Sequence, residues 1–199
     1  MSDCPPLPTP SAAGAGAPSD WVVRWSVLLP PRARVLDVAC GEGRHVRWLA
    51  QAGHQLTAVD RDTAAVAPLG RLARVVVADL EGAAWPLPGE RFDAVVVTNY
   101  LWRALMPDIL AAVAPGGLLV YETFSEAQAA LGRPRRPEFL LRHGELPQML
   151  QATQDWHVIA YEDGVLPASA GRAERAVQRI AARRRSGTDG ARDLLVAAG

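Results

Sequence analysis

A regular alternation of strand-like and helix-like segments between residues 33 and 124 limits this chain to one broad class of fold. Five short segments have apolar centres rich in Val, Leu or Ala: 33–39, 54–60, 73–79, 91–99 and 118–124. Segments with helical periodicity separate most of them, at 43–53, 61–71 and 101–114. Strands that are apolar on both faces and alternate with helices are typical of a parallel sheet covered on both sides. The sequence therefore predicts an α/β fold with right-handed crossovers.

The length of the chain fits a single domain of this class. Its 199 residues are 49% hydrophobic and 21% charged, which is enough to bury one sizeable core. We expect a disordered arm rich in Pro, Ala, Gly and Ser at residues 1–19, one domain at 20–185, and a flexible tail at 186–199. Asp20 is predicted to cap a helix over 21–29. The last third predicts a helix near 145–151 and a strand at 156–164, whereas 173–185 fits either a helix or a strand.

Composition excludes several kinds of chemistry. The formal net charge is zero, so nothing attracts the whole chain to nucleic acid or to an anionic membrane. The chain contains no Lys, which excludes Schiff-base chemistry and the lysine of a phosphate-binding P-loop. Cys4 and Cys40 form no disulfide framework, which favours a reducing cytoplasm. No apolar run approaches the ~20 residues of a membrane span, and the first residues do not resemble a signal peptide. No His/Cys cluster has metal-ligand spacing, so we predict no metal.

The segment VLDVACGEGRH, residues 35–45, has the pattern of a ligand-binding turn between a strand and a helix. Gly41 and Gly43 allow a sharp turn and a close approach of the backbone to a ligand. The start of the following helix offers N–H groups without intrahelical partners. Asp60 ends the next strand, where a carboxylate accepts hydrogen bonds from ribose hydroxyls. Two glycines alone also fit a dinucleotide site or a tight turn that binds nothing.

Three further residues distinguish these possibilities. Val46 stands where the dinucleotide pattern G-x-G-x-x-G/A requires a small residue. Asp37 precedes the glycines, and its carboxylate repels a pyrophosphate but attracts an ammonium or sulfonium group. Asp79 ends the third strand, where it or the neighbouring backbone can accept from the exocyclic amine of adenine. A cationic group, a ribose and an adenine are combined in S-adenosylmethionine.

The motifs together resemble the class I S-adenosylmethionine-dependent methyltransferases. They are VLDVACGEGRH, TAVDRD, VVVADLE, FDAVVVTNYL and VAPGGLLVYETF, and the resemblance extends in order over residues 21–182. The D-x-A-C-G-x-G-R-H variant is similar to the small, compact branch that includes tellurite-resistance methyltransferases. Ala39 departs from the broad family pattern, which prefers Gly at that position.

The resemblance implies a Rossmann-like doubly wound sheet of seven strands in the order 3-2-1-4-5-7-6, with strand 7 antiparallel. It therefore assigns residues 176–182 to a strand, against their local helix propensity. It also implies a cofactor site. Asp37, Ala39, Gly41 and Gly43 would surround the methionine part, Arg44 and His45 would approach its carboxylate, and Thr98 would close that end. Asp60 would bind the ribose, Arg61 would lie beside the adenine, and Asp79 and Leu80 would frame the adenine.

The methyl acceptor is expected to approach the carboxyl edge of the sheet, near Asn99, Tyr100 and Glu122. Tyr100 fits a packing role equally well. Glu122 lies in an otherwise apolar strand, so its carboxylate has either a function or an ion-pair partner such as Arg103 or Arg142. In the segment 132–146, Arg133, Arg135, Arg136, Arg142 and His143 fit either a lid over an anionic acceptor or a solvated loop. We interpret Cys40 as a small filler, and His45, His54 and His157 as surface or helix-start residues.

The leading hypothesis is a methyltransferase that acts on a small molecule. An RNA or protein methyltransferase is the alternative, in which Arg172, Arg175, Arg179 and Arg183–Arg185 bind phosphates. A non-catalytic S-adenosylmethionine-binding module is a third possibility, and an NAD-dependent oxidoreductase remains open on the glycines alone. The sequence determines neither the acceptor, nor the need for a general base, nor the oligomeric state.

Overall fold

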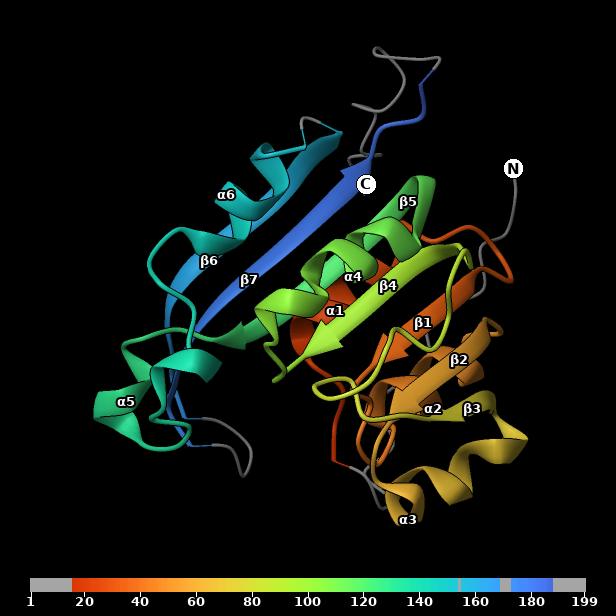
Figure 1. Cartoon of the computed structure of the whole chain (residues 1–199), viewed down its shortest axis with the longest axis horizontal. Helices are drawn as coiled ribbons and strands as arrows, with labels where there is room; N and C mark the ends of the chain where they lie inside the picture. Colours follow the sequence, from red (N-terminus) through yellow and green to blue (C-terminus); the bar gives the residue numbers. More distant parts are fainter. Residues whose placement is uncertain (1–15, 154, 169–172, 188–199) are drawn as a thin grey trace.

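The computed structural model describes residues 16–153, 155–168 and 173–187. A central sheet lies between two layers of helices, with α4 in front of the sheet and α1 behind it in the view of Figure 1. Most of the arm and tail predicted from composition, residues 1–15 and 188–199, lie outside the described residues. Ser19, which that prediction included in the arm, is fully buried.

The sheet has seven strands, and their order confirms the prediction. The strands are β1 (Arg34–Val38), β2 (Gln55–Asp60), β3 (Ala73–Val77), β4 (Phe92–Thr98), β5 (Val113–Phe124), β6 (Trp156–Leu166) and β7 (Arg175–Arg184). Their order is β3-β2-β1-β4-β5-β7-β6, and β7 pairs antiparallel with both neighbours. The segment whose composition fitted either a helix or a strand is therefore a strand, because it fills the place between β5 and β6.

The helices follow the predicted periodicity, with shifted ends. They are α1 (Asp20–Ser26), α2 (Arg44–Gln51), α3 (Thr63–Val66), α4 (Met106–Ala112), α5 (Gln128–Leu131) and α6 (Glu145–Gln151), with 3-10 turns η1 (Ala67–Arg71), η2 (Arg103–Leu105) and η3 (Pro137–Phe139). The cap of α1 is Ser19 and not Asp20, because the Ser19 side chain accepts from the N–H of Trp21. Pro107 lies in the first turn of α4, where its missing N–H has no consequence for the helix.

The segment Pro115–Gly117 lies between the predicted helix at 101–114 and the predicted strand at 118–124, but in the structure it is inside β5. The pairing of β4 with β5 is irregular here, with a register shift between Phe92 and Ala94. At Gly117 a Cβ would lie 2.8 Å from the carbonyl oxygen of Ala114 and 3.0 Å from that of Asp93. Glycine therefore lets the strand begin early, because it permits this close backbone approach.

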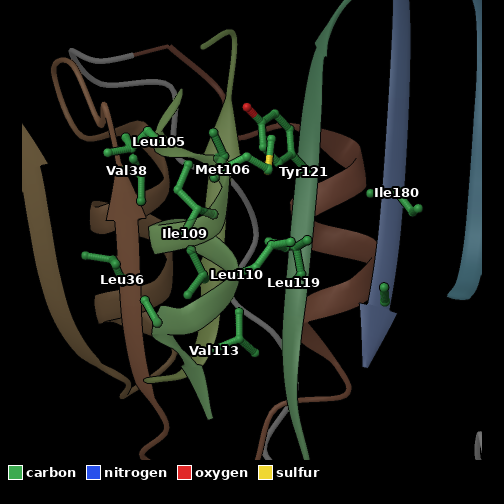
Figure 2. Packing of buried hydrophobic residues seen from close by; sticks show 14 of the residues in the cluster. Leu36, Val38, Leu105, Met106, Ile109, Leu110, Val113, Leu119, Tyr121 and Ile180 are labelled. Atoms are coloured by element: carbon green, nitrogen blue, oxygen red, sulfur yellow. The ribbon is translucent and has the colours of Figure 1, made fainter. Parts of the chain in front are cut away.

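Each face of the sheet has its own hydrophobic core. One core joins η2, α4 and α6 to the sheet, and Figure 2 shows Ile109 and Leu110 of α4 against Leu36, Leu119 and neighbouring side chains. The other core joins α1 and α2 to the opposite face. Because side chains alternate between faces, the two cores also determine where the polar residues at the strand ends point.

Four polar side chains at the strand ends share the face covered by α1. Val35, Val96, Val120 and Ala181 belong to the α1 core. Asp37, Thr98, Glu122 and Arg179 are each two residues away on the same strands, so they point to the same face. Since β1, β4, β5 and β7 are neighbours, these side chains form a row at one edge of the sheet.

Candidate cofactor site

The glycine turn between β1 and α2 has a backbone that side chains tolerate poorly. Ala39, Gly41 and Gly43 all have positive φ, at 53°, 53° and 74°. At Gly43 a Cβ would also lie 2.5 Å from the methyl groups of Leu69, so a larger residue would have to displace that side chain as well as adopt a positive φ. Ala39 adopts the left-handed region with a side chain, which carries a strain cost.

Asp37 lies beneath this turn and is 1% exposed. Neither of its carboxylate oxygens has a hydrogen-bond partner among the described residues. His45 lies nearby, with its Nδ1 3.9 Å from Oδ2. Burial raises the pKa of Asp37 to about 7, with Arg44 opposing the shift and Asp60 adding to it. A buried carboxyl group without a partner is costly, so this position is suited to receive a cationic donor from a ligand.

Asp60 connects the glycine turn to the end of β2. Its Oδ2 accepts from the N–H of Gly41 at 2.7 Å, and its Oδ1 accepts from the N–H of Asp62 at 3.0 Å. A carboxylate oxygen accepts more than one hydrogen bond, so both oxygens keep capacity for a ligand diol. Asp60 therefore holds the turn and lines the adjacent pocket.

A pocket of about 250 Å³ opens beside Asp60 at the ends of β1, β2 and β3. This volume is slightly below the roughly 300–1,000 Å³ that small-molecule sites occupy. Five residues proposed for the cofactor line it: Ala39, Asp60, Arg61, Asp79 and Leu80. Three other residues line the pocket. The sequence did not predict Ala78 or Glu81, and it predicted Tyr100 on the acceptor side instead. For Ala78 and Glu81 the signal was present, since they flank the strand-end pair 79–80.

Tyr100 belongs to the wall of this pocket, although the sequence analysis placed it on the acceptor side. Its hydroxyl is buried and has no hydrogen-bond partner among the described residues. Burial, and then the carboxyl groups of Glu81 and Asp79, raise the pKa of the phenol. Tyr100 therefore offers a neutral O–H donor on the nucleoside side of the site.

The opposite end of the site contains Arg44 and Thr98. Arg44 Nη2 lies 3.5 Å from Thr98 Oγ1 and is close enough to Asp37 to lower its pKa. Gly43 is the cap residue of α2 and supplies no side-chain acceptor, so the first N–H groups of α2 lack a capping side chain. A guanidinium group and a helix start together suit a ligand carboxylate.

His45 does not point into the pocket. It is 1% exposed, and its Nε2 accepts from the main-chain N–H of Ser19 at 3.1 Å. The interpretation as a surface or helix-start residue is therefore half right: His45 lies in the first turn of α2, but it is buried.

Glu122 is fully buried, and its ion pairs are not those proposed from the sequence. Its carboxylate lies 3.2 Å from Arg175 and 3.6 Å from Arg179. The proposed partners Arg103 and Arg142 are wrong. Arg103 Nε instead lies 2.6 Å from Glu145 of α6, which covers the other face of the sheet. The alternation of side chains along β5 directs Glu122 to the α1 face, away from Arg103.

The remaining acceptor-side candidates are in the loops. Asn99 is exposed, has a φ of 55°, and donates its main-chain N–H to the carbonyl of Glu122. In the arginine-rich segment, Arg136 pairs with Glu138 at 2.6 Å, and His143 lies 2.7 Å from Asp163. Arg133, Arg135 and Arg142 are exposed. Their role toward an anionic acceptor stays a prediction.

The described part of the chain contains neither a group of metal ligands nor a membrane-spanning helix. No group of three His, Cys, Asp or Glu side chains there could hold a metal ion. None of the helices there is long and apolar enough to cross a bilayer. Cys40 is buried and unpaired, and burial raises the pKa of its thiol, in line with a filler role.

Part of this chain is similar to known methyltransferases. Residues 35–117 match the family model described as a methyltransferase domain. The chain is 33% identical over 122 residues to trans-aconitate 2-methyltransferase of Delftia acidovorans, covering 55% of this chain and 45% of that protein. It is 28% identical over 154 residues to Hemagglutinin 1 of Eikenella corrodens, covering 72% of this chain and 50% of that protein. The chain thus spans about half the length of the curated relatives it matches.

The fold also matches a solved structure, TehB from Haemophilus influenzae. The TM-score is 0.66 at 21% identity, covering 82% of this chain and 61% of that one. The matched domain model spans all the residues that line the pocket, from Ala39 to Tyr100. Residues 35–117 of this chain therefore match a methyltransferase domain, and the fold is the one that TehB adopts.

Proposed function

We propose that the chain binds S-adenosylmethionine at the carboxyl edge of β1, β2 and β4 and transfers its methyl group to a small-molecule acceptor. The observation that carries the proposal is Asp37, a buried carboxyl group without a hydrogen-bond partner beside the glycine turn. A cationic amino-acid nucleoside supplies the donor that Asp37 lacks. The pyrophosphate of a dinucleotide would place negative charge there instead.

Each part of the site has a role in this proposal. Asp37 binds the ammonium group, and Arg44 with the start of α2 binds the carboxylate. Asp60 accepts from the ribose hydroxyls, while Arg61, Leu80 and Tyr100 enclose the adenine beside Asp79. When bound, S-adenosylmethionine supplies an electrophilic methyl group on a sulfonium. The residues of this chain hold and orient the ligand and exclude water, which is the main contribution a protein makes to an in-line displacement.

Glu122 has no free role as a general base in this arrangement. Two arginines and the Ser19 hydroxyl contact its carboxylate. We infer that it holds structure at the edge of the site. Asn99, which is exposed at the end of β4, then remains the acceptor-side candidate.

A small acceptor is favoured over RNA by the way the C-terminal arginines are used. Arg179 donates to Glu162 and Asp20, while Arg183 and Arg184 donate to main-chain carbonyls of Gly116 and Val113. These donors are occupied within the protein rather than presented to phosphates. Trans-aconitate 2-methyltransferase is one small-molecule enzyme among the similar proteins. We further propose that residues 20–185 act as one domain and that the chain works in the cytoplasm, where unpaired cysteines are usual.

Calorimetric titration with S-adenosylmethionine, S-adenosylhomocysteine and NAD tests the cofactor. We expect binding of the first two and none of NAD. Binding of NAD alone would overturn the proposal.

A turnover assay across a metabolite library, with S-adenosylhomocysteine as the readout, then identifies the acceptor. Binding without turnover on any metabolite, RNA or protein would favour the non-catalytic module. Turnover on RNA with a steep salt dependence would favour the alternative substrate class.

A further inference from the structure

Ser19 is a buried serine just before α1, and it joins three parts of the fold. Its main-chain N–H donates to His45 Nε2 at 3.1 Å. Its hydroxyl donates to Glu122 Oε2 at 2.9 Å and accepts from the N–H of Trp21 at 3.2 Å. Ser19 thereby connects the start of α1 to α2 and to β5, although Glu122 is 103 positions away in the sequence.

A set of ion pairs holds this connection in place. Glu122, which accepts from Ser19, lies 3.2 Å from Arg175 and 3.6 Å from Arg179 of β7. Arg179 also donates to Asp20 at 3.2 Å, and its guanidinium lies 4.7 Å from the ring centre of Trp21. The first two residues of α1 are therefore held against β7 by charge and by a cation–π contact.

The same connection passes beside the group that carries the proposed function. His45 lies between Ser19 and Asp37, with Nδ1 3.9 Å from Asp37 Oδ2. Because Nε2 accepts from Ser19, the ring proton is on Nδ1, the nitrogen that faces Asp37. His45 and Ser19 therefore lie between Asp37 and Glu122, which both belong to the row of strand-end side chains.

We propose that Ser19 is a positioning residue for the cofactor. Through its hydrogen bonds to His45 and Glu122, Ser19 holds the start of α1 as a wall beside the methionine end of the site. This inference rests on the proposed function. Release of the cofactor then requires the two Ser19 bonds to open, so their strength determines the dissociation rate. Neither bond reaches the ligand, so Ser19 acts through the wall and not on the reaction.

Ser19→Ala in the full chain, with Ser26→Ala as the matched control, tests the inference. Ser26 is the last residue of α1, is also buried, and donates to the carbonyl of Val23 at 2.9 Å. Each variant loses one buried hydroxyl, from the cap of α1 or from its last residue. We expect Ser19→Ala to release S-adenosylhomocysteine roughly tenfold faster in a stopped-flow displacement experiment, the change expected for a lost hydrogen bond to a charged group. Ser26→Ala should release it at the wild-type rate.

Two more variants separate positioning from helix capping. Ser19→Asp keeps a capping side chain but places a second carboxylate against Glu122, so it should release the ligand faster than Ser19→Ala does. Ser19→Thr keeps both hydroxyl bonds and should restore a rate close to the wild type. Equal dissociation rates for Ser19→Ala, Ser26→Ala and the wild type would overturn the inference.

Hydrogen exchange on the unmodified chain provides the test if a variant does not fold. S-adenosylhomocysteine should slow amide exchange in a peptide covering residues 16–26, because release and opening of the wall are coupled. Binding without added protection there would overturn the inference while leaving the proposed function intact. Absence of binding by the wild type would overturn both.

Discussion

Asp37 is the residue whose ionisation should control binding. Burial raises its pKa to about 7, against the influence of Arg44 and with that of Asp60, and His45 lies close by. An ammonium group binds the carboxylate form, so below pH 7 the ligand must displace a proton. Affinity for S-adenosylhomocysteine should therefore fall as the pH is lowered from 7, by up to about tenfold per pH unit. Calorimetry over this pH range measures the slope.

The control for this pH dependence is Asp37→Asn, which should bind weakly and lack that part of the slope. The raised pKa of Asp37 has the opposite effect on the stability of the ligand-free protein. Because the folded state keeps a proton that the unfolded chain releases, stability without ligand should fall as the pH rises from about 4 to 7. An equal slope in wild type and Asp37→Asn would contradict the assignment.

Asp60 is expected to contribute directly to ribose binding. Asp60→Ala should weaken S-adenosylmethionine binding by ~1–3 kcal/mol, the cost of losing hydrogen bonds to a charged group. Asp62→Ala is the control, because Asp62 is exposed and caps α3 without lining the pocket. It should lower stability but leave affinity unchanged. Unchanged affinity in a folded Asp60→Ala protein would exclude the ribose role.

Ala39 has a side chain at a position where the backbone favours glycine. Its φ is 53°, which costs about 1–2 kcal/mol in a non-glycine residue. Ala39→Gly removes this strain but gives the unfolded chain more freedom, by about 0.4–1 kcal/mol. A small net gain, up to about 1 kcal/mol, is expected in urea unfolding. A loss of stability would show that the Ala39 methyl packs productively in the pocket wall.

At the scale of elements, Arg103 fixes the loop that leads to α6. It donates twice to Glu145, at 2.6 and 2.8 Å, and also to the carbonyls of Glu138 and Leu140. Arg103→Ala leaves the buried Glu145 with only Arg142, which is exposed. We expect a loss of about 2–4 kcal/mol in the free energy of unfolding. Trypsin should also cleave faster at Arg135 and Arg142, whereas an unchanged cleavage pattern would contradict this role for Arg103.

The strands also show which parts of the fold and the site can be predicted from a single sequence. Apolar segments and periodicity predicted β1 to β5, and the acids at the strand ends predicted the pocket side of the site. Local propensity did not separate helix from strand at β7, because its place between β5 and β6 determines its structure. The partners of Glu122 were not predictable, since they depend on which face of β7 Arg175 and Arg179 occupy. Ser19 gave no signal, because its partners are remote in sequence.

At the scale of the whole molecule, the bonds of Ser19 and Asp20 predict how far the chain can be shortened from its N-terminal side without faster release of the ligand. A chain that begins at residue 16 keeps Ser19 and its bonds, so it should bind S-adenosylhomocysteine as the full chain does. A chain that begins at residue 21 loses Ser19 and Asp20, and it should release the ligand faster while keeping the pocket beside Asp60. Identical dissociation rates for the two shortened chains would show that the start of α1 is no part of the site.

The bonds of Glu122 and Arg179 also determine when the site can be completed during synthesis. Arg179 of β7 contacts Asp20 across 159 positions, nearly the length of the described chain. Contacts between such distant residues close late, because the intervening chain must be ordered first. A nascent chain that has emerged only as far as α6 contains the glycine turn and every residue that lines the pocket beside Asp60. It lacks β7, whose Arg179 contacts both Glu122 and Asp20. If Ser19 positions the cofactor as proposed, we expect tight retention of the ligand only after β7 has left the ribosome.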